Sequence, residues 1–314
     1  MSHVLPLPAV ILGGSDRRAT DLPEEGRDKH ALAGFKGAQV RLGGRALAEV
    51  LVERLRASGA FEPVLLVGPV AVYGDLLPRS MLIDANGTFG ANIRTGIEAV
   101  VARFPGRAVA FLTCDILPDG PRLRRLMERF AADAPFDLWF PLVRAPVQPA
   151  ELGASAWKPA YRIHATAGAP ATSVLPGHLV VVDPAALRLE FLYRLLDAGY
   201  RTRNRSIDRR RGAMLRGVLS ELLVEDLARV VRLRAPTVTW TMLRAALPAA
   251  RMLRDGAITL ADLERTLRTL FVRGRHRREH PGRRVHLPLV DEMFLARDID
   301  TVEEAQELGA SLGD

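Results

Sequence analysis

Cysteine, long apolar runs and a recognisable secretory signal are all scarce or missing in this sequence. The single cysteine, Cys114, cannot form a disulfide within the chain, which suits a reducing compartment. No apolar run approaches the roughly 18 residues that cross a bilayer. The apolar start, Val4 to Leu12, has no basic segment before it and runs into Gly13-Gly14, so it predicts a buried first strand. We therefore expect a cytoplasmic protein without a membrane span.

The charge of the chain is mostly of one kind. Its 314 residues carry a formal net charge of +8, almost all from arginine, on a globular background of 48% hydrophobic residues. A basic surface favours anionic partners such as nucleotides, phosphorylated metabolites, nucleic acid or acidic lipid. Two denser basic runs, 201–211 and 273–284, lack the interleaved aromatic residues of a nucleic-acid platform. We interpret the second run as a solvated basic loop and do not expect nucleic acid as a partner.

Short apolar runs alternate with amphipathic stretches through the first half of the chain, as in stacked strand–helix units. The runs are continuously apolar, which indicates strands buried on both faces of a mainly parallel sheet. The predicted strands are 9–12, 64–67, 81–83 and 108–112, and the predicted helices are 45–57, 90–104 and 121–131.

The second half of the chain is less regular. Asp183 followed by Pro184 predicts the start of a helix, and Thr301 predicts the cap of the last one. The stretch 144–176 is rich in Pro, Ala and Gly and predicts a loop region with one strand. The expected strands are 137–142, 161–164, 179–182 and 283–290, and the expected helical region is 211–271.

These patterns predict an α/β fold, a three-layer sandwich with a mixed, mainly parallel sheet. We expect one domain over residues 1–314, with a helical insertion at about 205–275. In such a sheet, ligands bind outside the carboxyl ends of the strands. The residues at those ends are therefore the candidates for chemistry.

Four strand or helix ends carry informative residues. Gly13-Gly14-Ser15 follows the first strand, where missing side chains let backbone N–H groups approach a phosphate. Asn92 lies in a helix opening that suits an anion or a base. Asp115 ends a buried strand, and the segment 297–301 adds Asp298 and Asp300 before the last helix.

Two carboxylates, a glycine turn and basic residues suit a magnesium–triphosphate site, because Mg²⁺ prefers one or two carboxylates plus phosphate oxygens. Each signal also has a structural interpretation. A Gly-Gly pair after a strand is often a plain turn, and a strand-end aspartate is often a hydrogen-bond acceptor. Asp300 is expected to cap the helix that begins at Thr301.

The order of several motifs resembles the MobA-like nucleotidyltransferases, which have the glycosyltransferase-A-type fold. The order Ala9–Gly14, a lysine and then Leu42–Arg45 looks like the opening of that family, and Thr-Cys-Asp at 113–115 is similar to its metal-binding strand end. The remaining similar segments are Pro176–Val181, Arg254–Leu263 and Asp298–Ala305.

The resemblance implies a role for each matched residue. Gly13, Gly14, Ser15 and Asn92 would contact the nucleotide, and Lys36, with Lys29 as its competitor, would neutralise the phosphates. Asp115 and Asp298 would bind Mg²⁺, and Gly177 and His178 would border the acceptor, although the family usually has asparagine where His178 stands.

The implied reaction transfers a nucleoside monophosphate from a nucleoside triphosphate to a phosphate or other oxyanion of a small-molecule acceptor, releasing pyrophosphate. Asp16 departs from the pattern because it stands where phosphates would pass. A nucleotide-sugar glycosyltransferase and a catalytically degenerate nucleotide-binding protein stay open as alternatives. The oligomeric state is not predicted.

Overall fold

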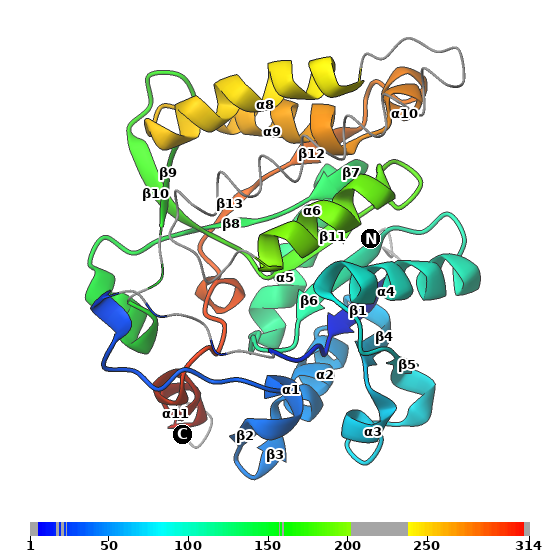
Figure 1. Ribbon diagram of the computed structural model, residues 1–314, viewed down its shortest axis with the longest axis vertical. Coiled ribbons are helices and arrows are strands. Elements are labelled where there is room, and N and C mark those ends of the chain that lie inside the picture. The colour runs from blue at the N-terminus through cyan, green and yellow to red at the C-terminus, as the bar shows by residue number, and fades with distance from the viewer. Residues whose placement is uncertain are drawn as a thin grey trace.

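The computed structural model describes residues 6–16, 19, 22, 24–156, 158, 160–201 and 238–310. A seven-stranded sheet forms its centre, with the strand order β12-β7-β11-β6-β1-β4-β5 (Figure 1). All neighbouring strands are parallel except β11, which is antiparallel to both β6 and β7. The strands of this sheet are β1 Leu7–Leu12, β4 Phe61–Gly68, β5 Leu82–Asp84, β6 Val109–Thr113, β7 Phe136–Trp139, β11 Leu179–Val182 and β12 Arg284–His286.

Two smaller sheets complete the strands. One has the order β13-β8-β10-β9, and the other is a two-stranded hairpin, β2-β3. Their strands are β2 Arg41–Leu42, β3 Arg45–Ala46, β8 Leu142–Arg144, β9 Tyr161–His164, β10 Ala171–Pro176 and β13 Leu289–Val290.

Helices cover both faces of the large sheet. Alternate residues of β1 divide between the two faces, since Ile11 packs with α2 and α5 while Val10 and Leu12 pack with α4 and α6. The longer helices are α2 Leu47–Ser58, α4 Phe89–Arg103, α5 Gly120–Asp133, α6 Leu189–Arg201, α8 Val238–Arg254, α9 Leu260–Phe271 and α11 Val302–Ala310. The shorter ones are α1 Lys36–Gln39, α3 Val70–Tyr73 and α10 Gly274–Glu279, with 3₁₀ turns at Glu24–Gly26, Arg79–Met81, Pro149–Ser155 and Met293–Leu295.

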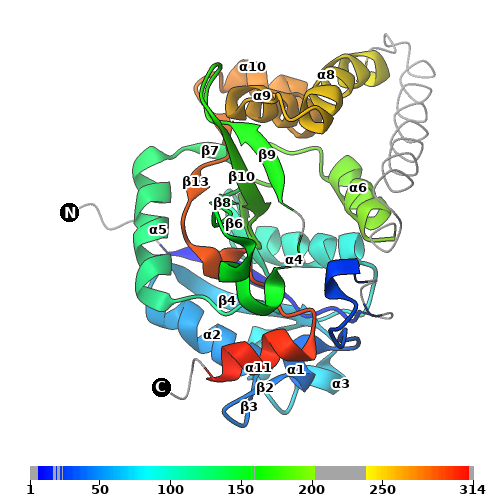
Figure 2. The ribbon, with the colours of Figure 1, turned by 90° about the vertical axis from the view of Figure 1, so that its left-hand side faces the viewer.

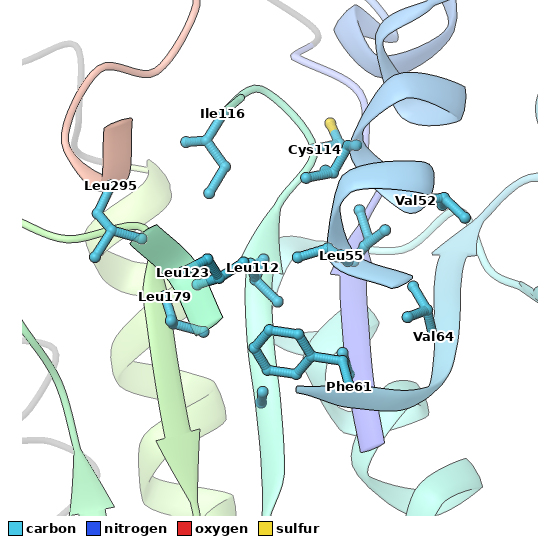
Figure 3. Packing of buried hydrophobic residues seen from close by; sticks show 14 of the residues in the cluster. Val52, Leu55, Phe61, Val64, Leu112, Cys114, Ile116, Leu123, Leu179 and Leu295 are labelled. Carbon is cyan, nitrogen blue, oxygen red and sulfur yellow. The ribbon is translucent and has the colours of Figure 1, made fainter. Parts of the chain in front are cut away.

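The core between the large sheet and helices α2 and α5 ends directly beneath Asp115. Leu112 of β6, Leu55 of α2 and Leu123 of α5 are at most 1% exposed. Figure 3 shows these side chains together, with Cys114 and Ile116 beyond the end of β6. Burial of Cys114 and Ile116 on either side fixes the backbone of Asp115 at the edge of this core.

The three-layer arrangement and the predicted elements of the first half are confirmed. Two predicted strands are wrong in one respect, because each divides between two sheets. The run 137–142 splits into β7 and β8 at Pro141, and the run 283–290 splits into β12 and β13 near Pro288. Proline has no N–H to donate to a neighbouring strand, so each of the two runs leaves the large sheet at its proline.

Three further expectations are wrong. The region 144–176 contains β10 as well as β9, because the two form a hairpin whose turn includes Gly168 at φ +82°. Asp183 does not begin a helix, because α6 starts only at Leu189. Its Oδ1 accepts from the Ala185 N–H within a turn, and its Oδ2 accepts from Arg283. The basic run after Arg273 forms the short helix α10 rather than a loop.

The predicted helical insertion is only partly described. Residues 205–237 lie outside the described residues, and 238–275 contain α8, α9 and the start of α10. Thr259 caps α9, as expected, by accepting a hydrogen bond from the Asp262 N–H at 3.1 Å. No helix in the described ranges is long and apolar enough to cross a membrane.

Candidate active site

Three carboxylates from distant parts of the chain meet at the end of β6. One ligand oxygen from each of Asp115, Asp298 and Asp300 lies within 4.8 Å of the others, and we call these three residues the acidic cluster. The N–H of Ile299 donates to the Asp115 carbonyl at 2.8 Å. Ile299 is fully buried beside Leu47, so its two neighbours project away from this small core toward Asp115.

Lys36, the first residue of α1, neutralises part of this charge. Its Nζ lies 2.5 Å from Asp300 Oδ1, 3.1 Å from Asp16 Oδ2 and 3.6 Å from Asp115 Oδ2. Burial alone would lower the pKa of Lys36, but the surrounding carboxylates outweigh it and raise that pKa. The ammonium is therefore charged at neutral pH although only 4% of the residue is exposed.

Lys158 forms the other side of the site, and the sequence analysis missed it. Its Nζ lies 2.5 Å from Asp298 Oδ1 and 3.2 Å from Glu304 Oε1. As at Lys36, burial opposes and the neighbouring carboxylates favour the charged form, and the net effect raises the pKa of Lys158.

A compositional signal could have identified Lys158. The chain has 44 basic residues, of which only three are lysines: Lys29, Lys36 and Lys158. A lysine ammonium is more compact than the guanidinium of arginine, so the few lysines of an arginine-dominated sequence are candidates for a site. Two of the three lie at the site.

The charges at this site do not balance. Five carboxylates, those of the acidic cluster together with Asp16 and Glu304, face the ammonium groups of Lys36 and Lys158. Asp115 Oδ1 is buried and has no hydrogen-bond partner within the described ranges. A buried anionic oxygen without a partner is costly, and an excess of carboxylates attracts a cation. These residues therefore fit a divalent metal.

The glycine turn lies beside the site. The Gly13 N–H donates to the Val67 carbonyl at 2.8 Å, so it is not available to a ligand, whereas no bond joins the amides of Gly14 and Ser15 to the described part of the chain. A Cβ on Gly14 would lie 3.2 Å from Asn92 Nδ2. Asn92 is buried and accepts from the Gly87 N–H at 3.0 Å, so it joins the loop before α4 to the glycine turn.

Gly177 and His178 lie in the turn between β10 and β11, and His178 faces the acidic cluster. A Cβ on Gly177 would lie 2.8 Å from the Pro141 carbonyl, so this position requires glycine for close packing. His178 Nδ1 lies 3.0 Å from Thr113 Oγ1, and its Nε2 lies 3.5 Å from Asp298 Oδ1. The imidazole is thus held between the end of β6 and the acidic cluster.

The end of α6 closes the opposite side of the glycine turn. The Tyr200 hydroxyl donates to Asp16, and its ring stacks on Phe89 with centroids 5.6 Å apart. Asp197 accepts from the Gly90 N–H at 2.7 Å and from Thr88 Oγ1 at 2.9 Å. A carboxylate of the chain itself therefore occupies the start of α4, where we expected a nucleotide.

The structure decides the position of two further residues, Asp300 and Lys29. Asp300 does not cap the last helix, because its carboxylate contacts Lys36, and Thr301 instead accepts from the Glu304 N–H at 3.3 Å. Lys29 lies apart from the site and pairs with Asp28 at 2.9 Å.

A sizeable hollow lies elsewhere. It has a volume of about 450 Å³, is lined by residues of α4 and of the segment 188–193, and shares no residue with the acidic cluster. The candidate site is therefore identified by its charge and not by this hollow.

Comparison with models of known families and with curated proteins gives no match. Solved structures do match. A hypothetical transferase from Thermus thermophilus is 18% identical over 95% of this chain and 99% of its own, with a TM-score of 0.51. A mannose-1-phosphate geranyltransferase, also from Thermus thermophilus, is 18% identical over 64% and 63%, with a TM-score of 0.41. A 4-diphosphocytidyl-2C-methyl-D-erythritol synthase from Anaerococcus prevotii is 9% identical over 98% and 99%, with a TM-score of 0.45.

The first of these likenesses extends over both chains and concerns the fold. Together with the order of the large sheet, it confirms the prediction of a glycosyltransferase-A-like α/β fold with a mixed, mainly parallel sheet. A shared fold does not determine a reaction. The function has to be argued from the site.

Proposed function

We propose that this protein is a nucleotidyltransferase that moves a nucleoside monophosphate from a nucleoside triphosphate to an oxyanion acceptor and releases pyrophosphate. The observation that carries the proposal is the acidic cluster, with three carboxylates within 4.8 Å of one another and with buried Lys36 and partly buried Lys158 against them. The resemblance of its strand-end motifs to the MobA-like nucleotidyltransferases supports the same reaction. We place this reaction in the cytoplasm, where nucleoside triphosphates are made.

Asp115 and Asp298, with Asp300 beside them, would hold Mg²⁺. When bound, Mg²⁺ supplies positive charge to the polyphosphate oxygens and steadies the charge that develops on pyrophosphate. The fit rests on the excess of carboxylates and on the buried oxygen of Asp115 that lacks a partner among the described residues.

Lys36 would bind the triphosphate directly. Its ammonium is fully charged at neutral pH because carboxylates raise its pKa. Those carboxylates hold the Nζ at the centre of the site, beside the glycine turn, before any substrate arrives. A charge that is already positioned costs no reorganisation when phosphate oxygens approach.

The glycine turn and Asn92 would position the nucleotide. The amides of Gly14 and Ser15 would donate to phosphate oxygens, and Gly13 would allow the turn to pack on Tyr73, which a Cβ would approach to 3.0 Å. Asn92 would act mainly by fixing this turn, because its side chain is buried.

Gly177 and His178 would border the acceptor. Thr113 orients the His178 ring so that Nε2 faces Asp298. A phosphate acceptor is already anionic, so it attacks the α-phosphate without a protein base. The site would act by aligning the two reactants in line.

Pyrophosphate release tests the proposal. The purified protein is incubated with each nucleoside triphosphate, Mg²⁺ and a panel of sugar phosphates and other oxyanions. We expect pyrophosphate in one combination, and a loss of roughly 10²- to 10³-fold in Asp115→Asn. Absence of turnover and of magnesium-dependent nucleotide binding across the panel would overturn the proposal.

The two alternatives have distinct products in the same assay. Asp298-Ile299-Asp300 provides a compact Asp-x-Asp within the acidic cluster, which suits a nucleotide-sugar glycosyltransferase. That enzyme would consume a nucleotide sugar and release a nucleoside diphosphate. A degenerate member would bind a nucleotide, shown by a raised thermal midpoint, and turn over nothing.

A further inference from the structure

One described part of the molecule is strongly basic. Residues 238–286, which we call the helical unit, contain 11 arginines and no lysine against four carboxylates, a formal net charge of +7. The unit consists of α8, α9, α10 and β12. Figures 1 and 2 both place its helices at the end of the long axis away from α1, which begins with Lys36, and from α11, which follows Asp298 and Asp300 in the chain.

One face of α8 combines this charge with an apolar side chain. Arg244, Leu247, Arg251 and Arg254 follow one another at spacings of three and four residues, so they share one side of the helix, and all four are exposed. Leu247 is 39% exposed. The opposite side of α8, including Met242 and Ala249, is buried against the rest of the protein. We call these four residues the exposed stripe. They face solvent while the other side of α8 packs on the protein.

The arginines of the stripe are largely uncompensated. Arg254 pairs with Asp255 at 2.8 Å, whereas Arg244 and Arg251 pair with no carboxylate of the described ranges. The same excess appears at α10, where burial and the charges of Arg268 and Arg278 lower the pKa of Arg277. Positive charges crowded without nearby carboxylates attract an anionic surface.

We propose that the exposed stripe of α8 docks the protein onto an anionic phospholipid surface. Arginine guanidinium groups would pair with lipid phosphates, and Leu247 would enter the boundary between headgroups and acyl chains, as basic and apolar side chains do at interfacial helices. Leu247 favours this occupant, because an exposed apolar side chain among arginines suits the boundary between headgroups and acyl chains. The proposal is independent of the reaction proposed above.

Cosedimentation with lipid vesicles tests the proposal. The full-length protein is mixed with vesicles of phosphatidylcholine alone or with about one third phosphatidylglycerol, at low and at physiological salt. We expect binding only to the anionic vesicles, weakened by salt. The double variant Arg244→Glu, Arg251→Glu should bind at least tenfold more weakly, and Leu247→Ala should lose a smaller part of the binding.

A matched control distinguishes the stripe from net charge. Arg56→Glu with Arg125→Glu makes the same change in charge at exposed positions of α2 and α5, and we expect it to retain most of the binding. Equal losses in both double variants would overturn the proposal, since any basic surface would then suffice. Failure to bind anionic vesicles at low salt, or preferential binding of an oligonucleotide under the same conditions, would also overturn it. Circular dichroism of each variant verifies that it is folded.

Discussion

Two groups of charges at different places in this fold differ in their balance of positive and negative charge. At the candidate site, the acidic cluster together with Asp16 and Glu304 places five carboxylates against two lysines. At the start of β7, fully buried Asp137 accepts from Arg283 Nε at 2.8 Å and lies 3.0 Å from His276 Nε2, while Arg283 also pairs with Asp183 at 2.6 Å. The second group is nearly neutral and joins β7, α10 and β12.

Both groups contain a buried carboxylate oxygen without a hydrogen-bond partner in the described part of the chain, so this feature does not tell them apart. Asp115 Oδ1 and Asp137 Oδ2 are both buried without a hydrogen-bond partner among the described residues. What separates them is the number of carboxylates that converge on one point. A balanced pair stabilises one arrangement of the chain, whereas converging carboxylates store repulsion that a cation relieves. The comparison therefore favours a structural role for Asp137 and supports the proposal that Asp115 binds a ligand.

Matched substitutions of these two aspartates should have opposite consequences. Asp137→Asn removes the charge that compensates Arg283 and should lower the free energy of unfolding by about 3 kcal/mol. Asp115→Asn relieves repulsion and should leave the stability of the metal-free protein unchanged or raised, while abolishing the gain in thermal midpoint that Mg²⁺ gives the parent. Denaturant unfolding measures the free energies of unfolding, and thermal unfolding with and without Mg²⁺ measures the midpoints. A large loss of stability in Asp115→Asn would show that the acidic cluster is structural.

The lysines offer the next largest effect. Lys36→Ala removes the charge held beside the glycine turn and should weaken binding of a nucleoside triphosphate by tenfold or more. Lys29→Ala is the control, because Lys29 pairs with neighbouring Asp28 at the surface and should change binding by less than twofold. Titration calorimetry with Mg²⁺ present compares the two. A larger loss for Lys29 would place the phosphates on the outer loop.

The sequence predicted the fold well where the chain repeats strand and helix, because continuous apolar runs specify buried parallel strands. It failed where one apolar run serves two sheets, since the divisions near Pro141 and Pro288 depend on neighbours that only the folded chain brings together. Strand-end reasoning selected Asp115 and Asp298, which the structure brings together, but Lys158 stands in a segment without periodicity. Its partners lie 140 or more residues away, so no local pattern could reveal it.

Asp16 gives a smaller expected effect than Lys36. It contacts Lys36 and follows the glycine turn, where the phosphates are expected to pass. Its carboxylate engages both Lys36 and Tyr200. Asp16→Asn removes one negative charge and leaves Asp300 to hold Lys36, so nucleotide binding should tighten by a few-fold. The measurement is the affinity for a nucleoside triphosphate with Mg²⁺. Weaker binding would mean instead that Asp16 contributes to the metal or to the nucleotide.

Cys114 gives the smallest expected effect, and it separates burial from reactivity at the edge of the acidic cluster. Burial, reinforced by the negative charge of Asp115, raises the pKa of Cys114 to about 12 from 9.0. The folded state therefore favours the protonated thiol. The stabilisation from this proton is fully present below pH 9, and it is lost as the pH rises from 9 through about 12. Between pH 9 and 12 the free energy of unfolding should therefore fall less steeply with pH in Cys114→Ala than in the parent, by the contribution of one proton.

Thiol labelling tests the burial of Cys114 directly. At pH 8 a thiol reagent should label the native protein no faster than the chain unfolds, because the thiolate is the reactive species. Rapid labelling at that pH, with the fold intact by circular dichroism, would contradict the burial of Cys114 beneath the proposed metal site.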